Sequence, residues 1–412
     1  MTGLVIIGAS YAGVQAALTA REAGYSQPIT IVCDEEWLPY QRPPLSKDFL
    51  LGRISEQNLI LRDETFFEDK QINLVLGQRA TLLDLRARQV TLAGDNALAF
   101  EKLLIATGSR ARRIAVEGAD FDGIFYLRSV TDAIDLKAGL ADAAEIVIVG
   151  GGFIGLEVAA SAAKLGKKVT VVEASSRLLE RAVSPVLSAF LLDTHLRAGV
   201  EVMLDETVAS FKGNDRKVSA VVLGNGAVVH ADLVLVGIGG VANDEIARSA
   251  GLRCTNGIVV DAHGQSETSD IFAAGDCANH FNRFCESWVR LESVQNAQDQ
   301  AKAAGLAIAG ARAPYENVPR FWFDQYDVKL QIVGLAGQYD RQAVRGSVDD
   351  GRFSVFYYRQ GRLVAVDSVN RPGEQMAARR LIAAGISPAP EQAADPSFDL
   401  KSLVTAGDKA GA

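Results

Sequence analysis

The sequence predicts an α/β protein with two doubly wound, Rossmann-like dinucleotide-binding domains and a smaller C-terminal α+β domain. Two segments share one pattern, in which an apolar strand, a glycine turn, an alanine-rich helix and a strand ending in acid follow each other: LVIIGASYAGVQAALTAREAGYSQPITIVCDE and EIVIVGGGFIGLEVAASAAKLGKKVTVVEAS. This pattern is typical of a βαβ unit. After Val318 the pattern changes to the alternation expected of antiparallel strands.

Composition excludes several classes of protein. The chain has 412 residues, 48% of them hydrophobic and 22% charged, which matches globular usage and argues against disorder. A net charge of −8 argues against nucleic acid as the main partner. The N-terminal apolar run is too short for a signal peptide or a membrane span, and four cysteines cannot form a disulfide scaffold. We therefore expect a soluble, cytoplasmic protein.

The first glycine turn runs from Gly8 to Gly13, between a strand and a helix, as a dinucleotide fingerprint requires. Gly8 makes the tight turn, Gly13 lets helix pack on strand, and the helix N-terminus faces a pyrophosphate. Ser10 replaces the usual middle glycine, where its hydroxyl can donate to phosphate. Asp34, 21 residues beyond Gly13, is the expected ribose ligand, and Glu35 is the alternative.

The second glycine turn is an unbroken fingerprint, GGGFIG, whose candidate cofactor-binding residues are Gly150, Gly152, Ile154 and Gly155. Glu173 lies 18 residues after Gly155, where it would accept from a ribose 2′-hydroxyl and repel a 2′-phosphate. The pattern therefore favours NADH over NADPH, although Arg177 lies nearby.

Three further buried strands end in small residues that can approach a cofactor. They end at Ala106-Thr107-Gly108, at a glycine-rich turn containing Gly237 and Gly239, and at Gly275-Asp276. A basic run after the first of these strands is expected to form a solvated loop face: Arg110, Arg112 and Arg113.

The C-terminal region is expected to form four strands, a hairpin turn at residues 359–362 and a helix. Pro372 begins that helix and Gly385 follows it. The tail from Ser387 is rich in alanine and proline, and we expect it to pack loosely. The four histidines lack metal-ligand spacing, so we expect no metal site and assign them to surface or hydrogen-bonded polar positions: His195, His230, His263 and His280.

Two dinucleotide modules suggest one held flavin and one exchanging nicotinamide. The order of GASYAG, PPLSK, IATG, GGGFIGLE, GIG and AAGD resembles the two-dinucleotide flavoproteins of glutathione-reductase-like fold. PYQRPPLSKDFL, SWVRLESVQNAQDQA and FWFDQY resemble the bacterial NADH-dependent ferredoxin reductases, of the putidaredoxin reductase and biphenyl-dioxygenase types. The resemblance implies FAD and NADH as cofactors. It also implies electron transfer to a two-iron two-sulfur ferredoxin that serves a haem monooxygenase or a Rieske oxygenase.

The resemblance also implies roles for single residues. It places the following around FAD: Ala12, Asp34, Arg42, Lys47, Ala80, Arg128, Asp276 and Val294. It pairs Lys47 with Glu157 beside the nicotinamide and places Trp322 near the flavin ring, so these three are the catalytic candidates. Each has a plainer alternative: a solvated lysine, a first-turn glutamate favoured by the helix dipole, and a core aromatic. Asp276 could likewise simply cap a helix.

The resemblance implies an FAD domain of residues 1–111 and 242–316, an NADH domain of residues 112–241 and a C-terminal domain of residues 317–412. It gathers Arg62, Lys302 and Lys329 near the isoalloxazine as candidate docking residues for an acidic ferredoxin. Two other functions remain open: an NADH-sensing flavoprotein resembling apoptosis-inducing factor, and a soluble NADH:quinone reductase. The sequence does not identify the ferredoxin, the terminal oxygenase or the oligomeric state.

Overall fold

In the computed structural model, which describes residues 2–404, the first βαβ pattern builds a sheet with strand order β3-β2-β1-β6-β5-β4 and β18 paired to β6. This sheet belongs to a unit formed by the residues up to Gln41, Leu59–Arg110 and Val241–Phe321. The strands of the sheet are β1 (Gly3–Ile7), β2 (Ile29–Val32), β3 (Ile72–Val75), β4 (Ala80–Asp84), β5 (Gln89–Leu92), β6 (Ala97–Ile105) and β18 (Ile271–Ala273). The unit also has a separate sheet of β17 (Ile258–Val260), β19 (Ala278–Asn282) and β20 (Ser287–Val289). The helices of the unit are α1 (Tyr11–Glu22), α3 (Glu64–Asp69), α7 (Glu245–Ser249) and α8 (Val294–Ile308).

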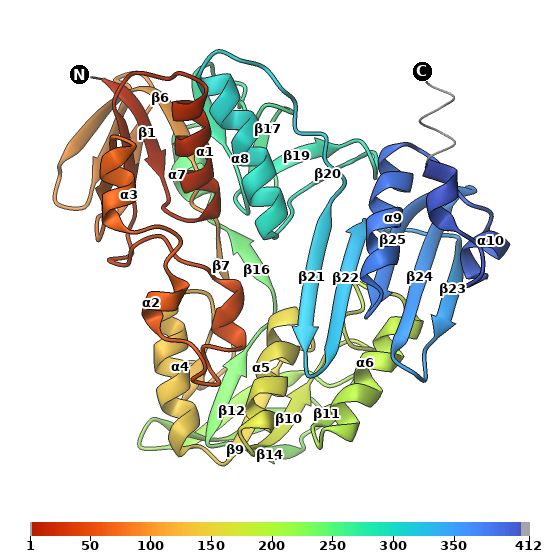
Figure 1. The fold of residues 1–412 in the computed structure, drawn as a ribbon. Helices are drawn as coiled ribbons and strands as arrows, with labels where there is room; N and C mark the ends of the chain where they lie inside the picture. The colour runs from red at the N-terminus through yellow and green to blue at the C-terminus, as the bar shows by residue number, and fades with distance from the viewer. Residues whose placement is uncertain (1, 405–412) are drawn as a thin grey trace. The chain divides into compact units, whose positions relative to one another are not determined.

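Helices α1 and α8 lie side by side in this unit (Figure 1). A Cβ atom at Gly305 of α8 would lie 2.7 Å from the Ala16 carbonyl oxygen of α1, so only glycine permits this approach. The two helices lie far apart in the sequence. Their close packing therefore joins the N-terminal segment to the segment around residue 300.

The second βαβ pattern builds a parallel sheet of order β11-β10-β9-β15-β8 in another unit, formed by Arg42–Asn58, Ala111–Gly240 and the residues from Trp322 onward. Its strands are β8 (Ile124–Phe125), β9 (Glu145–Val149), β10 (Lys168–Val172), β11 (Glu201–Met203) and β15 (Leu233–Val236), with an antiparallel set β12 (Val208–Asn214), β13 (Lys217–Leu223) and β14 (Val228–His230). Its helices are the 3₁₀ helix η1 (Pro43–Ser46), α4 (Val130–Asp142), α5 (Phe153–Lys164) and α6 (Pro185–Arg197).

Short elements lie at the sequence positions where the chain passes between the units. They are α2 (Glu56–Leu59), β7 (Ser109–Ala111) and β16 (Gly240–Ala242). The basic run therefore begins in a strand rather than a loop, although the side chains of Arg110, Arg112 and Arg113 are exposed as expected.

The C-terminal sheet has order β21-β22-β25-β24-β23, with antiparallel β22–β25–β24–β23 pairing. Its elements are β21 (Arg320–Gln325), β22 (Val328–Gly334), β23 (Arg341–Ser347), β24 (Arg352–Arg359), β25 (Arg362–Val369), α9 (Pro372–Ala383) and α10 (Pro390–Ala394). Arg359 pairs with Arg362 across the predicted hairpin. Helix α9 begins at Pro372, and Gly385 follows it at φ +68°, which confirms the predicted helix and its end.

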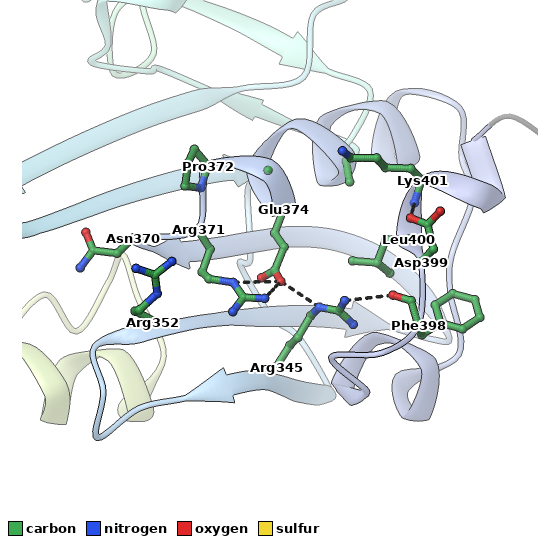
Figure 2. Close-up of a pocket in the computed structure, with 12 residues that line it drawn as sticks. Arg345, Arg352, Asn370, Arg371, Pro372, Glu374, Phe398, Asp399, Leu400 and Lys401 are labelled. Atoms are coloured by element: carbon green, nitrogen blue, oxygen red, sulfur yellow. Dashed lines mark hydrogen bonds and ion pairs between the residues drawn. The ribbon is translucent and has the colours of Figure 1, made fainter.

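The expectation of a loosely packed tail is wrong for residues 387–404. Buried Arg345 donates to the carbonyl oxygens of Ala393, Asp395, Pro396 and Phe398, and its Nε donates to Glu374 Oε1 at 2.9 Å. Figure 2 shows this guanidinium at a pocket of about 300 Å³ in the C-terminal domain. One arginine from β23 therefore holds the tail against the sheet. Residues 405–412 lie outside the described range.

Candidate functional site

The register of the first sheet brings three predicted motifs to one edge. Ile7 of β1 pairs with Ile105 of β6, and Ile105 pairs with Ala273 of β18, all in parallel strands. The residues that follow these strands begin GASYAG, ATG and AGD, so the three turns leave the sheet at the same level. Ligands of open α/β sheets bind outside the carboxyl ends of the strands. This edge is the first candidate site.

The glycines of the first fingerprint are required by backbone contact. Gly8 has φ +115°, and a Cβ there would lie 2.1 Å from the Ala106 carbonyl oxygen. A Cβ at Gly13 would lie 1.9 Å from the Gly8 carbonyl oxygen, so α1 begins directly against the turn. Ser10 is the N-cap of α1, and its side chain makes no capping hydrogen bond. The turn fits a dinucleotide phosphate at the helix N-terminus.

The two acidic candidates for the ribose differ in their surroundings. Asp34 is exposed just beyond the end of β2. Glu35 is half-buried, and its Oε2 accepts a hydrogen bond of 2.5 Å from the Tyr40 hydroxyl. Because Glu35 already serves an internal contact, the geometry favours Asp34 for the ribose.

The AAGD turn contains a polar contact that the sequence did not predict. Gln300 of α8 is 1% exposed, and its Oε1 accepts from the Gly275 N–H at 2.9 Å. Gly275 has φ +83°, and a Cβ there would lie 3.1 Å from the Ala12 Cβ. The Asp276 carboxylate accepts from the Ser109 hydroxyl at 3.2 Å. Gln300 therefore fixes the backbone from which the Asp276 side chain projects.

Asp276 does not cap a helix, so that alternative is wrong: it lies between β18 and β19, and the N-cap of α8 is Ser293. The other predicted residues of this unit lie at element ends. Val294 is the first residue of α8, and Ala80 is the first residue of β4. Thr107, between Ala106 and Gly108, donates from its hydroxyl to the Asn243 carbonyl oxygen at 2.6 Å.

The second sheet brings a second set of motifs to one edge. Val149 of β9 pairs with Val172 of β10 and with Val236 of β15. The next residues along these strands are Gly150, Glu173 and Gly237. A Cβ at Gly150 would lie 2.5 Å from the Gly237 carbonyl oxygen.

The helix that follows this turn begins directly against it. A Cβ at Gly155 would lie 2.2 Å from the Gly150 carbonyl oxygen, and Gly152 is the N-cap of α5. Ile154 is exposed in the first turn of the helix, and Gly239 beyond β15 has φ +106°. The arrangement repeats that of the first fingerprint.

Glu173 follows β10, next to the central strand β9. Its Oε2 accepts from the Gly151 N–H at 2.6 Å, and its Oε1 accepts from the Ser175 N–H at 2.7 Å. Arg177 donates to the carbonyl oxygens of Glu180 and Val183, both at 2.7 Å. The Arg177 guanidinium is therefore engaged within its own loop.

Lys47 and Glu157 form an ion pair in the structure, with 2.6 Å between Nζ and Oε1. Lys47 is 22% exposed and Glu157 is 5% exposed, so Lys47 is not the solvated lysine of the alternative. Glu157 is the fifth residue of α5, beyond its first turn, which also excludes the helix-dipole alternative. Burial raises the pKa of the Glu157 carboxyl, and Lys47 and Ser46 oppose that rise.

The remaining catalytic candidate, Trp322, is 43% exposed, so the core-aromatic alternative is wrong. Its neighbour Phe323 is the buried residue and contacts Phe153 at 5.1 Å between ring centroids. Arg42 donates to the Arg128 carbonyl oxygen at 2.8 Å, which joins the start of η1 to the segment before α4.

The predicted docking residues are all exposed. Arg62 donates to the Leu61 carbonyl oxygen at 2.6 Å, and Lys302 Nζ lies 3.7 Å from Asp299 Oδ1. Lys329 precedes Leu330 in β22.

The histidines and cysteines differ in their surroundings. His195 has both ring nitrogens bonded, as expected, whereas His280 is 2% exposed with no hydrogen-bond partner among the described residues, which contradicts the expectation for it. Burial raises the pKa of the Cys33 thiol and raises that of Cys254 to about 11. Within residues 2–404, no group of three potential ligands could hold a metal ion, and no helix has the length and apolar character to cross a membrane.

Two dinucleotide edges in one chain, each with a fingerprint turn, define a two-dinucleotide oxidoreductase. Residues 2–301 match the pyridine nucleotide-disulphide oxidoreductase family, and residues 320–404 match the reductase C-terminal family. The chain belongs to the pyridine nucleotide-disulphide oxidoreductase family and is an oxidoreductase that uses FAD and NADH.

The chain is similar to reductases of small electron-carrier proteins. Rhodocoxin reductase of Rhodococcus erythropolis is 44% identical over 398 residues, which cover 97% of this chain and 93% of that protein. The reductase in a covalent complex of putidaredoxin reductase with putidaredoxin is 38% identical, with a TM-score of 0.95 and 99% of both chains covered. A ferredoxin reductase from Rhodopseudomonas palustris is 39% identical, with a TM-score of 0.96 over 98% of this chain and 100% of that one.

Proposed function

We propose that this protein is an NADH:ferredoxin oxidoreductase, which passes electrons from NADH through FAD to a two-iron two-sulfur ferredoxin that serves a haem monooxygenase or a Rieske oxygenase. The observation that carries the proposal is the end-to-end similarity to rhodocoxin reductase and to the reductase bound to putidaredoxin. We place the protein in the cytoplasm, where NADH is supplied.

FAD is assigned to the edge of the first sheet, in a domain of residues 1–111 and 242–316. The residues proposed to bind it are Gly8, Ser10, Ala12, Gly13, Asp34, Arg42, Lys47, Ala80, Ala106, Thr107, Gly108, Arg128, Gly275, Asp276 and Val294. The tight turns at Gly8 (φ +115°) and Gly275 (φ +83°) support this assignment, because glycine lets the backbone approach a dinucleotide closely at such turns.

NADH is assigned to the edge of the second sheet, in a domain of residues 112–241, with residues 317–412 as the C-terminal domain. The residues proposed to bind it are Gly150, Gly152, Ile154, Gly155, Glu157, Glu173, Gly237 and Gly239. The acid at Glu173 supports NADH rather than NADPH, since its carboxylate accepts hydrogen bonds and would repel a 2′-phosphate.

Bound FAD supplies the chemistry that accepts a hydride and releases its electrons singly. The protein contributes position and surroundings. Glu157, paired with Lys47, offers a buried carboxylate to the carboxamide of the nicotinamide and so fixes the ring for transfer. The exposed ring of Trp322 is proposed to meet the flavin.

Ferredoxin docking is assigned to positive charge on a protein whose net charge is −8. Ferredoxins of this kind are acidic, so a local positive patch is needed to steer the encounter. Arg62, Lys302 and Lys329 are the proposed contributors. Reversing all three charges should slow ferredoxin reduction at least tenfold while NADH–ferricyanide turnover persists, and added salt should slow the wild type. Equal losses with ferricyanide, or salt-independent ferredoxin reduction, would remove these residues from the proposal.

The proposed function is tested with purified protein, NADH and putidaredoxin, with cytochrome c as the final acceptor. The protein should carry one non-covalent FAD per chain, and cytochrome c reduction should depend on the ferredoxin. Quinone reduction without ferredoxin, or NADH-dependent dimerisation with negligible turnover, would contradict the proposal.

A further inference from the structure

Ser46 contacts helix α5 at two points. It is the last residue of η1 and is 2% exposed. Its hydroxyl donates to Glu157 Oε2, and its carbonyl oxygen accepts from the Ser161 hydroxyl at 2.8 Å. Glu157 and Ser161 are four residues apart and therefore lie on one face of α5. One serine thus connects the segment that carries Lys47 to the helix that carries Glu157.

The charge on Glu157 is under opposing influences. Burial raises the pKa of its carboxyl, and the negative charge of Asp324 on β21 raises it further. The ammonium of Lys47, 2.6 Å from Oε1, and the hydroxyl of Ser46 on Oε2 both lower it. A protonated Glu157 would lose its attraction to Lys47 and would offer a donor where the proposed nicotinamide contact needs an acceptor.

We propose that Ser46 is a positioning residue for hydride transfer: its hydroxyl holds one carboxylate oxygen of Glu157 and turns the other toward Lys47. The inference rests on the proposed function, in which this ion pair meets the nicotinamide. A hydroxyl suits the task because it donates a hydrogen bond without adding a second charge that would have to be buried. Lys47 is more exposed than Ser46, so Ser46 is the donor inside the protein.

The chain supplies a matched control. Ser161→Ala removes the other hydrogen bond between η1 and α5 but leaves both donors on Glu157 in place. If Ser46 served only to anchor η1, Ser46→Ala and Ser161→Ala would act alike. If it serves the charge on Glu157, only Ser46→Ala changes the pH dependence.

The experiment follows flavin reduction by saturating NADH in an anaerobic stopped-flow instrument between pH 5 and 9. Loss of a hydrogen bond to a charged group shifts a pKa by about one unit or more. In Ser46→Ala the pH of half-maximal rate on the acid side should therefore rise by about one unit or more. Ser161→Ala should match the wild type, and Ser46→Thr, which keeps the hydroxyl, should restore the wild-type profile. In Glu157→Gln, flavin reduction should be slow and should lack the acid limb, which is the fall in rate at low pH.

The outcomes separate this inference from the proposed function. Equal acid-side shifts in Ser46→Ala and Ser161→Ala, or no shift in either, would overturn the role of Ser46 while a slow Glu157→Gln variant still supports the ion pair. Wild-type rates for Glu157→Gln at every pH would remove the ion pair from the reaction. A persistent acid limb in Glu157→Gln would show that another group titrates and would overturn the inference.

Discussion

The preference for NADH over NADPH can be worked out from the contacts of Glu173. Both carboxylate oxygens accept backbone N–H groups, from Gly151 at 2.6 Å and from Ser175 at 2.7 Å, so the acid is held at the end of β10. An incoming ribose 2′-hydroxyl can donate to this carboxylate, whereas a 2′-phosphate cannot and is repelled. Arg177 cannot compensate without leaving the carbonyl oxygens of Glu180 and Val183.

The magnitude follows from one hydrogen bond to a charged group, which contributes about 1.5–3 kcal/mol. Since about 1.4 kcal/mol corresponds to a factor of ten, kcat/KM for NADH should exceed that for NADPH by at least about tenfold and up to roughly 150-fold. Glu173→Ala should remove most of this ratio, because the backbone N–H groups of Gly151 and Ser175 would then face the phosphate. Arg177→Ala should leave the NADPH value unchanged.

The assay is steady-state ferricyanide reduction with each nucleotide, which avoids any dependence on ferredoxin. Wild-type values within threefold of each other would refute the reasoning about Glu173. A further loss of NADPH activity in Arg177→Ala would show that the guanidinium leaves its loop to bind phosphate.

Three other predictions concern contacts described above. Lys47→Met and Glu157→Gln should each slow flavin reduction by NADH, by raising its activation free energy by up to about 3 kcal/mol. The double variant should be no slower than the slower single variant, and additive losses would argue against a functional pair. Gln300→Leu should weaken FAD binding to deflavinated protein about tenfold, whereas Gln298→Leu, on the same helix, should not; equal effects would mean that α8 is simply destabilised. Arg345→Met should lower the free energy of unfolding by about 3–5 kcal/mol, which would be measured as a lower melting temperature. An unchanged melting temperature would contradict the role of Arg345.

The fingerprints could be predicted from the sequence because their chemistry is local. Gly8 and Gly150 each follow a strand and precede a helix, and the reason for glycine lies in contacts with the adjacent strand end. Lys47 and Glu157 are 110 positions apart. Their pairing is therefore predicted by the family resemblance and not by sequence spacing.

Other contacts had no local signal. Ser46 and Gln300 meet partners that are distant in sequence, and neither residue type is diagnostic of a site. The packing of the tail has no signal in the sequence, because Arg345 binds mostly backbone carbonyl oxygens, which every sequence possesses. For His280 the general rule that buried polar groups are hydrogen-bonded gives the wrong expectation, because this buried histidine has no hydrogen-bond partner among the described residues.

The first sheet is built from strands that are far apart in the sequence, and this has a consequence for biosynthesis. β6 ends at Ile105, but its partner β18 begins at Ile271, so the ribosome adds more than 160 residues before that strand is available. At about 5–20 residues per second this delay lasts roughly 10–30 s. Meanwhile the strands of the second parallel sheet, β8 to β15, have all been made by Val236. The inserted nucleotide module can thus complete its sheet on the nascent chain first, while the exposed edge of β6 waits for the strand that ends in Ala273.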